Sequence, residues 1–90
     1  MKKRKKLLIK GRVQKVGFRA SCLEAALENN ICGNVRNTAD GNVFVDAEGK
    51  EDDLLKFIAW CHQGPFWAKV TTVEQTDDGI KGFDIFEIVR

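Results

Sequence analysis

The spacing of apolar residues in this 90-residue chain changes between two periods, and the order of the changes restricts the fold. Alternation with a period of two predicts a strand, whereas apolar positions three or four residues apart predict a helix. Strand patterns cover residues 5–11, 33–38, 42–48, 70–76 and 84–89, and helix patterns cover residues 20–30 and 51–63. Turn signals separate them, including Asp40-Gly41 between two strands and Gly64-Pro65 after the second helix.

This order, βαββαβ with one further strand, predicts an α+β protein. The natural candidate is the ferredoxin-like arrangement, an antiparallel sheet of four to five strands with two helices on one face. Asp46 and Glu48 alternate with apolar residues over residues 42–48, so the opposite face should be partly open to solvent. The length suits one small domain, residues 1–90, with no room for a second core.

Basic residues cluster at the N-terminus, although the formal net charge is only +2. The run Lys2–Lys6 suits a contact with nucleic acid or an anionic membrane. We favour the alternative of a solvated tail that leads into the first strand, because the remainder of the chain is slightly acidic. Residues 1–5 are therefore expected to be a basic N-terminal segment that can be disordered.

The cysteines and the hydropathy pattern indicate the compartment. Cys22, Cys32 and Cys61 lack metal-ligand spacing, and His62 is the only histidine, so we expect no metal and no cofactor. Cys22 and Cys61 fall on the apolar faces of the predicted helices, which indicates structural thiols in a reducing cytoplasm. No apolar run approaches the roughly 20 residues that cross a bilayer. We expect a cytoplasmic protein with no membrane partner.

The segment GRVQKVGFR, residues 11–19, connects the first strand to the first helix and predicts an anion site. The first amides of a helix lack intrahelical partners and, with the helix dipole, favour negative charge. Arg19 lies beside this positive helix end, which is unfavourable unless an anion binds there. The alternative is a surface salt bridge of Arg19 with Glu24 or with the C-terminal carboxylate.

Paired motifs resemble the acylphosphatase family. VQKVGFR, residues 13–19, is similar to the last seven positions of its signature G-x-V-Q-G-V-G-F-R. GNVRN, residues 33–37, followed by Asp40-Gly41, resembles G-[aromatic]-V-[basic]-N-x-x-D-G. GPFWAKV, residues 64–70, followed by Val73-Glu74, is similar to the family's G-P-x-x-A-x-V-x-x-V-E. The resemblance covers residues 7–90.

The resemblance implies an acylphosphatase that hydrolyses acyl phosphates, which are mixed anhydrides of a carboxylic acid and phosphate, without metal or a covalent intermediate. Arg19 would bind and stabilise the phosphate, and Asn37 would orient the attacking water. Inorganic phosphate would be both product and inhibitor. The phosphate would also be bound by the backbone amides of Gln14, Lys15, Val16, Gly17, Phe18 and Arg19.

Some residues in and around these motifs also have a purely structural interpretation. Asn37 could be a turn residue ahead of the hairpin, where asparagine is common. Ser21 and Glu24 match a capping box, which we prefer to nucleophilic catalysis by Ser21. Trp60 and Trp67 are expected to be packing or rim residues.

Three positions depart from the family pattern. Lys15 replaces a usual glycine. If that glycine is needed for a positive φ, lysine strains the loop by roughly 1–2 kcal/mol; if only the amide matters, the ammonium strengthens phosphate attraction. We expect phosphate binding to be retained with altered affinity. Asn34 replaces the aromatic residue that usually follows the first glycine of the second motif. Phe66 stands where proline is common in the third motif. Neither change removes a catalytic group.

Two other classes of function are compatible with this fold class. RNA-binding ferredoxin-like domains display aromatic residues on the central strands, but here only Phe44 is available, beside Asp46 and Glu48. We therefore do not expect a nucleic-acid partner. A non-catalytic or regulatory relative, such as the acylphosphatase-like segment of a carbamoyl-transfer protein, stays open. A stand-alone, monomeric enzyme with a small-molecule acyl phosphate substrate is favoured, because no carbamoyl-transfer or zinc-binding region is attached.

Overall fold

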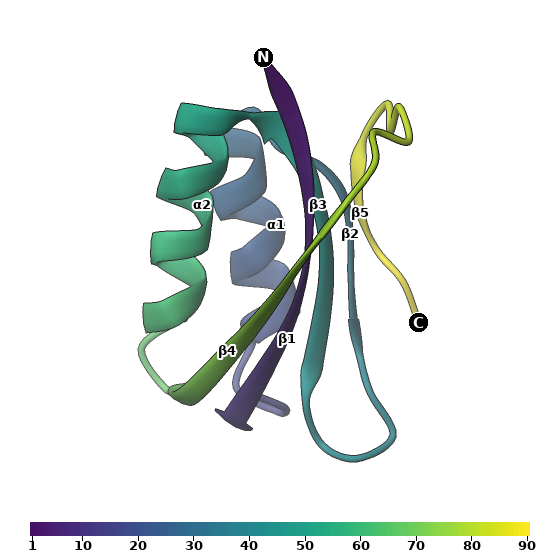
Figure 1. Ribbon diagram of the computed structural model, residues 1–90. Helices are drawn as coiled ribbons and strands as arrows, with labels where there is room; N and C mark the ends of the chain where they lie inside the picture. The colour runs from purple at the N-terminus through teal and green to yellow at the C-terminus, as the bar shows by residue number, and fades with distance from the viewer.

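The computed structural model describes all 90 residues and contains two helices and five strands. The elements are β1 (Lys2–Arg12), α1 (Phe18–Glu28), β2 (Cys32–Asn37), β3 (Val43–Lys50), α2 (Glu51–Gln63), β4 (Lys69–Asp78) and β5 (Phe86–Ile88). The strands form one sheet in the order β4-β1-β3-β2-β5, and both helices lie on the same face of it (Figure 1). The predicted ferredoxin-like arrangement of βαββαβ with one further strand is confirmed.

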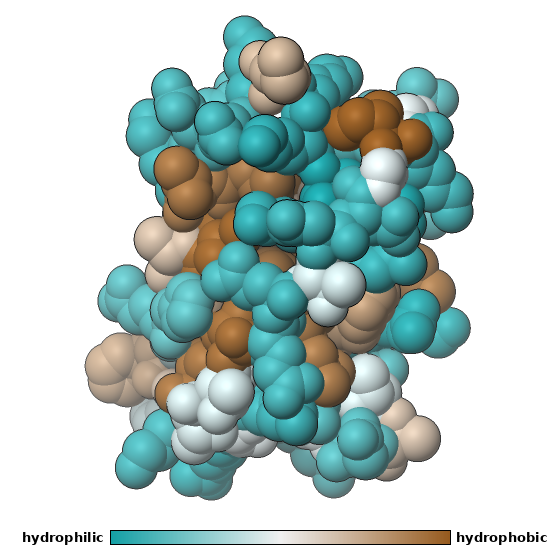
Figure 2. All heavy atoms as spheres, viewed as in Figure 1, coloured by the Kyte–Doolittle hydropathy of each residue, from teal (hydrophilic) through white to brown (hydrophobic).

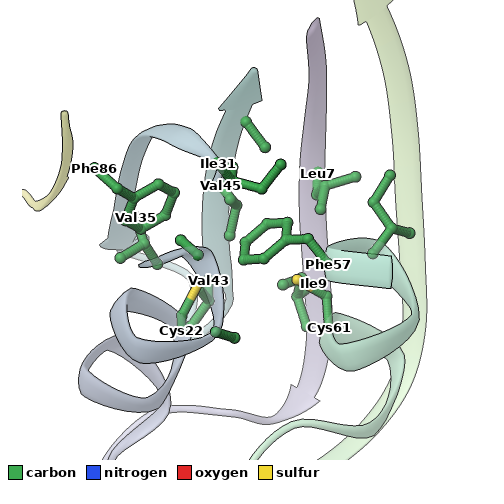
Figure 3. Close-up of a cluster of buried hydrophobic side chains, with 14 of the residues drawn as sticks. Leu7, Ile9, Cys22, Ile31, Val35, Val43, Val45, Phe57, Cys61 and Phe86 are labelled. Carbon is green, nitrogen blue, oxygen red and sulfur yellow. The ribbon is translucent and has the colours of Figure 1, made fainter. Parts of the chain in front are cut away.

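The core fills the space between the sheet and the helices with 17 buried apolar residues. β1 and β3 contribute to it because alternate side chains of a strand point to the same face. Leu7 pairs with Val45 and Ile9 pairs with Val43, and all four side chains are fully buried. The ring of Phe57, from α2, lies among these strand side chains in Figure 3.

α2 has the apolar face that its periodicity predicted. Leu54, Ile58 and Cys61 are buried, as is Phe57 beside them. Leu55, which is next to Leu54 in the sequence, points away from the core and is 60% exposed. The helix ends at Gly64, whose φ of 69° suits glycine.

β5 is the strand that departs from an antiparallel arrangement. It pairs in parallel with β2, with Gly33 opposite Phe86 and Val35 opposite Ile88. The sheet is therefore mixed. β4 and β5 lie at opposite edges of the sheet, so the chain crosses the sheet after β4 (Figure 1). β5 is also shorter than the strand predicted for residues 84–89.

β4, at the other edge of the sheet, is mostly exposed and polar. Figure 2 shows mainly hydrophilic side chains along the front of the molecule, where Figure 1 places this strand. Charged residues on an edge strand disfavour pairing with another chain.

The basic run at the N-terminus is not a tail. Lys2–Lys6 form the first half of β1 and pair with β3. The Arg4 guanidinium donates to both carboxylate oxygens of Asp46, at 2.9 and 2.8 Å, and Lys5 forms an ion pair with Asp77 at 2.9 Å. The prediction of a solvated tail that can be disordered is wrong, because β3 and β4 provide backbone partners and negative charge for these residues.

The sheet face opposite the helices is also less open than expected. Asp46 and Glu48 are only 6% and 2% exposed, so the prediction that they lie on a solvated face is wrong. The Glu48 carboxylate accepts hydrogen bonds from the backbone amides of Lys81, Gly82 and Phe83, at 2.6 to 3.2 Å. These bonds hold the segment after β4 over this end of the sheet and satisfy a carboxylate that would otherwise be buried without partners.

We expect the Glu48 contacts to make the stability of the fold depend on pH. Burial raises the pKa of Glu48, but the three backbone hydrogen bonds and the charge of Lys2 together bring it below its usual value. A carboxylate with a lower pKa in the folded state stabilises the protein at neutral pH, and this stabilisation is lost as the pH falls through the folded-state pKa. Glu48→Gln should lower the free energy of unfolding by about 2–3 kcal/mol at pH 7, measured by urea denaturation.

The acid dependence of Glu48→Gln should be weaker than that of the wild type but not absent. Asp77 and Asp78 also have lowered pKa values, because they are hydrogen-bonded to Lys5 and Lys6. The exposed Glu87 provides a matched control: Glu87→Gln should change the free energy of unfolding by less than about 0.5 kcal/mol. Identical pH dependence in the wild type and Glu48→Gln would contradict the assignment.

Candidate active site

The loop between β1 and α1, residues 13–17, contains two residues with left-handed backbone conformation. Lys15 has φ 62° and Gly17 has φ 76°, while Val16 between them has a negative φ. None of the protein's turn and loop hydrogen bonds is donated by the amides of residues 14–19. Alternation of backbone hand turns successive amides toward one concave side, a geometry that binds anions. Loop 13–17 thus has the conformation and the unpaired donors that an anion site requires.

Gly17 marks the start of α1, which begins at Phe18 rather than at the predicted residue 20. No side chain caps the helix, and the Ser21 amide donates to the Gly17 carbonyl at 3.1 Å. The predicted capping box of Ser21 and Glu24 is therefore wrong, because Ser21 already lies inside the first turn. The consequence is that no capping side chain competes for the amides at the helix N-terminus.

Arg19 lies in this first turn, which contains no acidic residue. The side chain is half-buried and takes part in none of the ion pairs of the structure. The alternative of a salt bridge with Glu24 or with the C-terminal carboxylate is therefore wrong. A guanidinium beside the positive end of a helix has no protein charge to balance it, which favours an anionic ligand.

Asn37 is the last residue of β2 and pairs with Val43. It is in the strand rather than in the turn, so the turn interpretation is wrong. Asn37 has the same parity as Val35, which is fully buried, and so points to the helix-covered side of the sheet. Because the strand ends here, Asn37 lies at the margin of the core and is only half-buried.

Arg19 and Asn37 line one hollow of about 210 Å³. Loop 13–17, the first turn of α1 and the end of β2 together form this hollow. Its lining residues are Val13, Lys15, Gly17, Phe18, Arg19, Ala20, Asn37, Ile88 and Arg90. The structure therefore brings together two residues that the sequence indicated through separate motifs.

Gln14 and Val16 are not among the residues that line the hollow. The Gln14 side-chain amide reaches the hairpin between β2 and β3, and Val16 packs against the core. Their predicted role involves only backbone amides, which donate none of the protein's turn and loop hydrogen bonds. The Phe18 ring packs against Trp60, with ring centroids 5.3 Å apart, so the packing role predicted for Trp60 is confirmed.

Sequence reasoning missed Ile88 and Arg90 in the lining of the hollow. They reach it because β5 pairs with β2, with Ile88 opposite Val35, and the Val89 amide donates to the Val35 carbonyl at 2.9 Å. Arg90, the last residue of the chain, therefore lines the hollow next to Ile88. No local pattern could have indicated this, because the parallel pairing joins segments that are distant in the chain.

The remaining candidates for chemistry do not gather into a second site. No three His, Cys, Asp or Glu side chains come together in a geometry that could hold a metal ion. Cys22 and Cys61 are buried, and burial raises the pKa of the Cys61 thiol, which favours its protonated form. Neither helix has the length and apolar character needed to cross a membrane.

Comparison with known proteins identifies the family. The family model for acylphosphatase matches residues 5–88. The chain belongs to the acylphosphatase family. The curated acylphosphatase of Synechococcus sp. (strain CC9605) is 49% identical over 81 residues, which cover 90% of this chain and 98% of that protein. The crystal structure of acylphosphatase from Bacillus subtilis is 34% identical, with a TM-score of 0.95, and the match covers 100% of both chains. The expected family and enzyme class are confirmed.

The acylphosphatase fold also occurs within a larger protein. The crystal structure of full-length HypF matches with a TM-score of 0.89 and 25% identity, and the match covers 100% of this chain but 12% of HypF. A unit of this fold therefore occurs both as a separate chain and within a longer protein.

Replacement of Lys15 tests the strain in loop 13–17. The positive φ of Lys15 disfavours a side chain by roughly 1–2 kcal/mol. Glycine removes this strain but increases the entropy of the unfolded chain, which offsets about 0.4–1 kcal/mol of the gain. Lys15→Gly should therefore raise the free energy of unfolding by about 0.5–1 kcal/mol, measured by urea denaturation.

Lys15→Ala is the matched control for this experiment. It removes the same ammonium group but keeps a Cβ at positive φ, so it should not stabilise the protein. Equal stabilisation by both variants would mean that the effect arises from the charge, and would contradict the strain argument.

Proposed function

We propose that this chain hydrolyses acyl phosphates to a carboxylate and inorganic phosphate by a metal-independent mechanism. The main support for this proposal is that Arg19, Asn37 and residues of loop 13–17 line the same hollow. Membership of the acylphosphatase family supports the same reaction.

The phosphate group of the substrate would occupy the concave side of loop 13–17. The amides of residues 14–19 donate to its peripheral oxygens, and the Arg19 guanidinium can bind two of these oxygens at once. Negative charge spreads over these oxygens in the transition state, so fixed donors and a fixed positive charge lower the barrier. Lys15 lines the same hollow and adds to the positive potential.

The Asn37 side-chain amide would orient the attacking water. The water oxygen bonds to phosphorus as the bond between phosphorus and the acyl oxygen breaks, and the bonding electrons leave with the carboxylate. An amide is not an effective base, and the water proton would pass to a phosphate oxygen of the substrate. Positioning and electrostatics therefore supply the rate enhancement.

The dimensions of the site favour broad specificity for the acyl group. A hollow of about 210 Å³ accommodates the phosphate and leaves little enclosed space beyond it. The acyl group would then extend toward solvent and make few contacts. We propose that the enzyme acts as a monomer in the cytoplasm on small acyl phosphates, with inorganic phosphate as product and inhibitor.

A non-catalytic or regulatory role is the second candidate, since a unit of this fold also forms part of a larger protein: the match covers 12% of the HypF chain. An RNA-binding role has less support than the sequence indicated, because several residues of the basic run already form ion pairs with acidic side chains. Turnover of benzoyl phosphate by the purified protein in the presence of a chelator separates the enzyme from both alternatives.

Two substitutions test the catalytic assignment. Arg19→Ala and Asn37→Ala should each lower kcat/KM for benzoyl phosphate by about 100-fold or more, because each removes an interaction with the transition state. Circular dichroism should show that both variants remain folded. Activity equal to that of the wild type in either variant would contradict the assignment.

β2 offers matched controls for both variants. Arg36 and Asn34 alternate with Asn37 and lie on the opposite face, where the Arg36 guanidinium stacks over the Phe44 ring at 4.6 Å. Arg36→Ala removes the same charge as Arg19→Ala, and Asn34→Ala removes the same amide as Asn37→Ala. Both controls should keep kcat/KM within about threefold of the wild type, because the side chains that they remove lie on the face of the sheet opposite the hollow.

Inorganic phosphate should inhibit competitively with benzoyl phosphate. In an NMR titration, phosphate should shift the amide signals of residues 14–19, since these amides have no acceptor within the protein. Arg19→Ala should weaken this binding by about tenfold or more, because it removes a bidentate, charge-assisted contact. Unchanged amide signals in loop 13–17 at saturating phosphate would contradict the proposed anion site.

A further inference from the structure

The side chain of Gln14 links the two halves of the proposed active site. Its Nε2 atom donates to the backbone carbonyls of Thr38 and Asn42, at 2.8 Å in both cases. Gln14 belongs to loop 13–17, whereas Thr38 and Asn42 belong to the hairpin between β2 and β3. No other hydrogen bond joins this loop to the hairpin.

The two accepting carbonyls lie next to Asn37. Asn37 pairs with Val43 in the last pair of the ladder between β2 and β3. Thr38 comes directly after β2, and Asn42 comes directly before β3. The Thr38 amide donates to the Asn42 carbonyl at 2.9 Å, which closes the hairpin. Gln14 thus holds both sides of the hairpin at its base, one residue beyond Asn37.

We propose that Gln14 is a positioning residue that sets the distance between the phosphate loop and the water-orienting amide of Asn37. This inference rests on the proposed function. Loop 13–17 holds the phosphorus, and Asn37 holds the water, so the in-line attack requires a fixed separation between them. The two hydrogen bonds of Gln14 fix that separation without contacting the substrate.

The chemistry of glutamine suits this role. Its terminal NH2 group provides two donors on one atom, which match two carbonyl acceptors. It is neutral, so it leaves the charge of the anion site unchanged. Glutamate of the same shape has no donor when ionised, and asparagine has the donors on a side chain that is one methylene shorter.

Gln14→Met tests the proposal, because methionine has a similar length and no donor. The kcat for benzoyl phosphate should fall by about tenfold or more, since a displacement of about 1 Å is enough to impair an oriented reaction. The inhibition constant of inorganic phosphate should stay within about twofold, because the amides of residues 14–19 and Arg19 are unchanged. This separation of kcat from phosphate affinity distinguishes positioning from phosphate binding.

Asn29→Ala is the matched control. The Asn29 side-chain amide also donates to a backbone carbonyl at 2.8 Å, that of Ala25, but at the far end of α1. Its loss should lower stability while leaving kcat within about twofold. Gln14→Asn is the second variant, which keeps the donors and should have a kcat between those of Gln14→Met and the wild type.

Hydrogen exchange provides a test that does not depend on turnover. In Gln14→Met the Thr38 amide should exchange about tenfold faster, because the base of the hairpin opens more readily. If the wild type failed to hydrolyse benzoyl phosphate, the proposed function would fail, while this measurement would still test the link. A wild-type kcat in Gln14→Met, an equal loss of phosphate affinity, or unchanged Thr38 exchange would overturn the inference.

Discussion

The site depends on the pairing of Val43 with two partners. Val43 lies opposite Ile9 in β1 and opposite Asn37 in β2. This rung, the last of the ladder between β2 and β3, therefore joins β1, which leads into loop 13–17, to the end of β2, where Asn37 lies. A shift of one residue in the β2–β3 register would move Asn37 to the other face of the sheet, away from Arg19. The same shift would carry buried side chains such as Val35 out of the core, so the packing energy of the core also maintains the geometry of the active site.

The distribution of charge separates the structural part of the sheet from the functional end. On β1 the cations meet anions of the protein itself, as in the paired Arg4 and Asp46. At the hollow, Lys15 and Arg19 come together without forming ion pairs with acidic side chains. Positive charge that the fold leaves unbalanced, beside amides without acceptors, indicates a place for an anion from outside the protein. The family comparison is consistent with this interpretation, since the relatives are acylphosphatases.

Predictions from the sequence succeeded where the information was local and failed where charge depended on distant neighbours. The periodicity of α2 and the alternation in β3 gave the correct elements, because the burial of a helix face or strand face follows directly from spacing. The solvated tail at Lys2–Lys6 and the open face at Glu48 were wrong, because strand pairing and the segment after β4 provide partners from elsewhere in the chain. Ser21 illustrates a further limit: its capping pattern was outweighed by the left-handed conformation of Gly17, which starts the helix earlier.

The sequence by itself determined the order of the elements, the loop that ends at Arg19 and the second motif that contains Asn37. Motifs and periodicity are properties of neighbouring residues, so they are readable without the fold. Only the tertiary structure decided that these motifs share one hollow, that Arg90 lines it, and that the Gln14 side chain joins its two halves. These are contacts between segments far apart in the chain, and they exist only after the sheet has selected its register. The structure also showed that Lys15 has a positive φ of 62°. The physical reason is that the surrounding fold holds the loop in this shape against the steric preference of lysine.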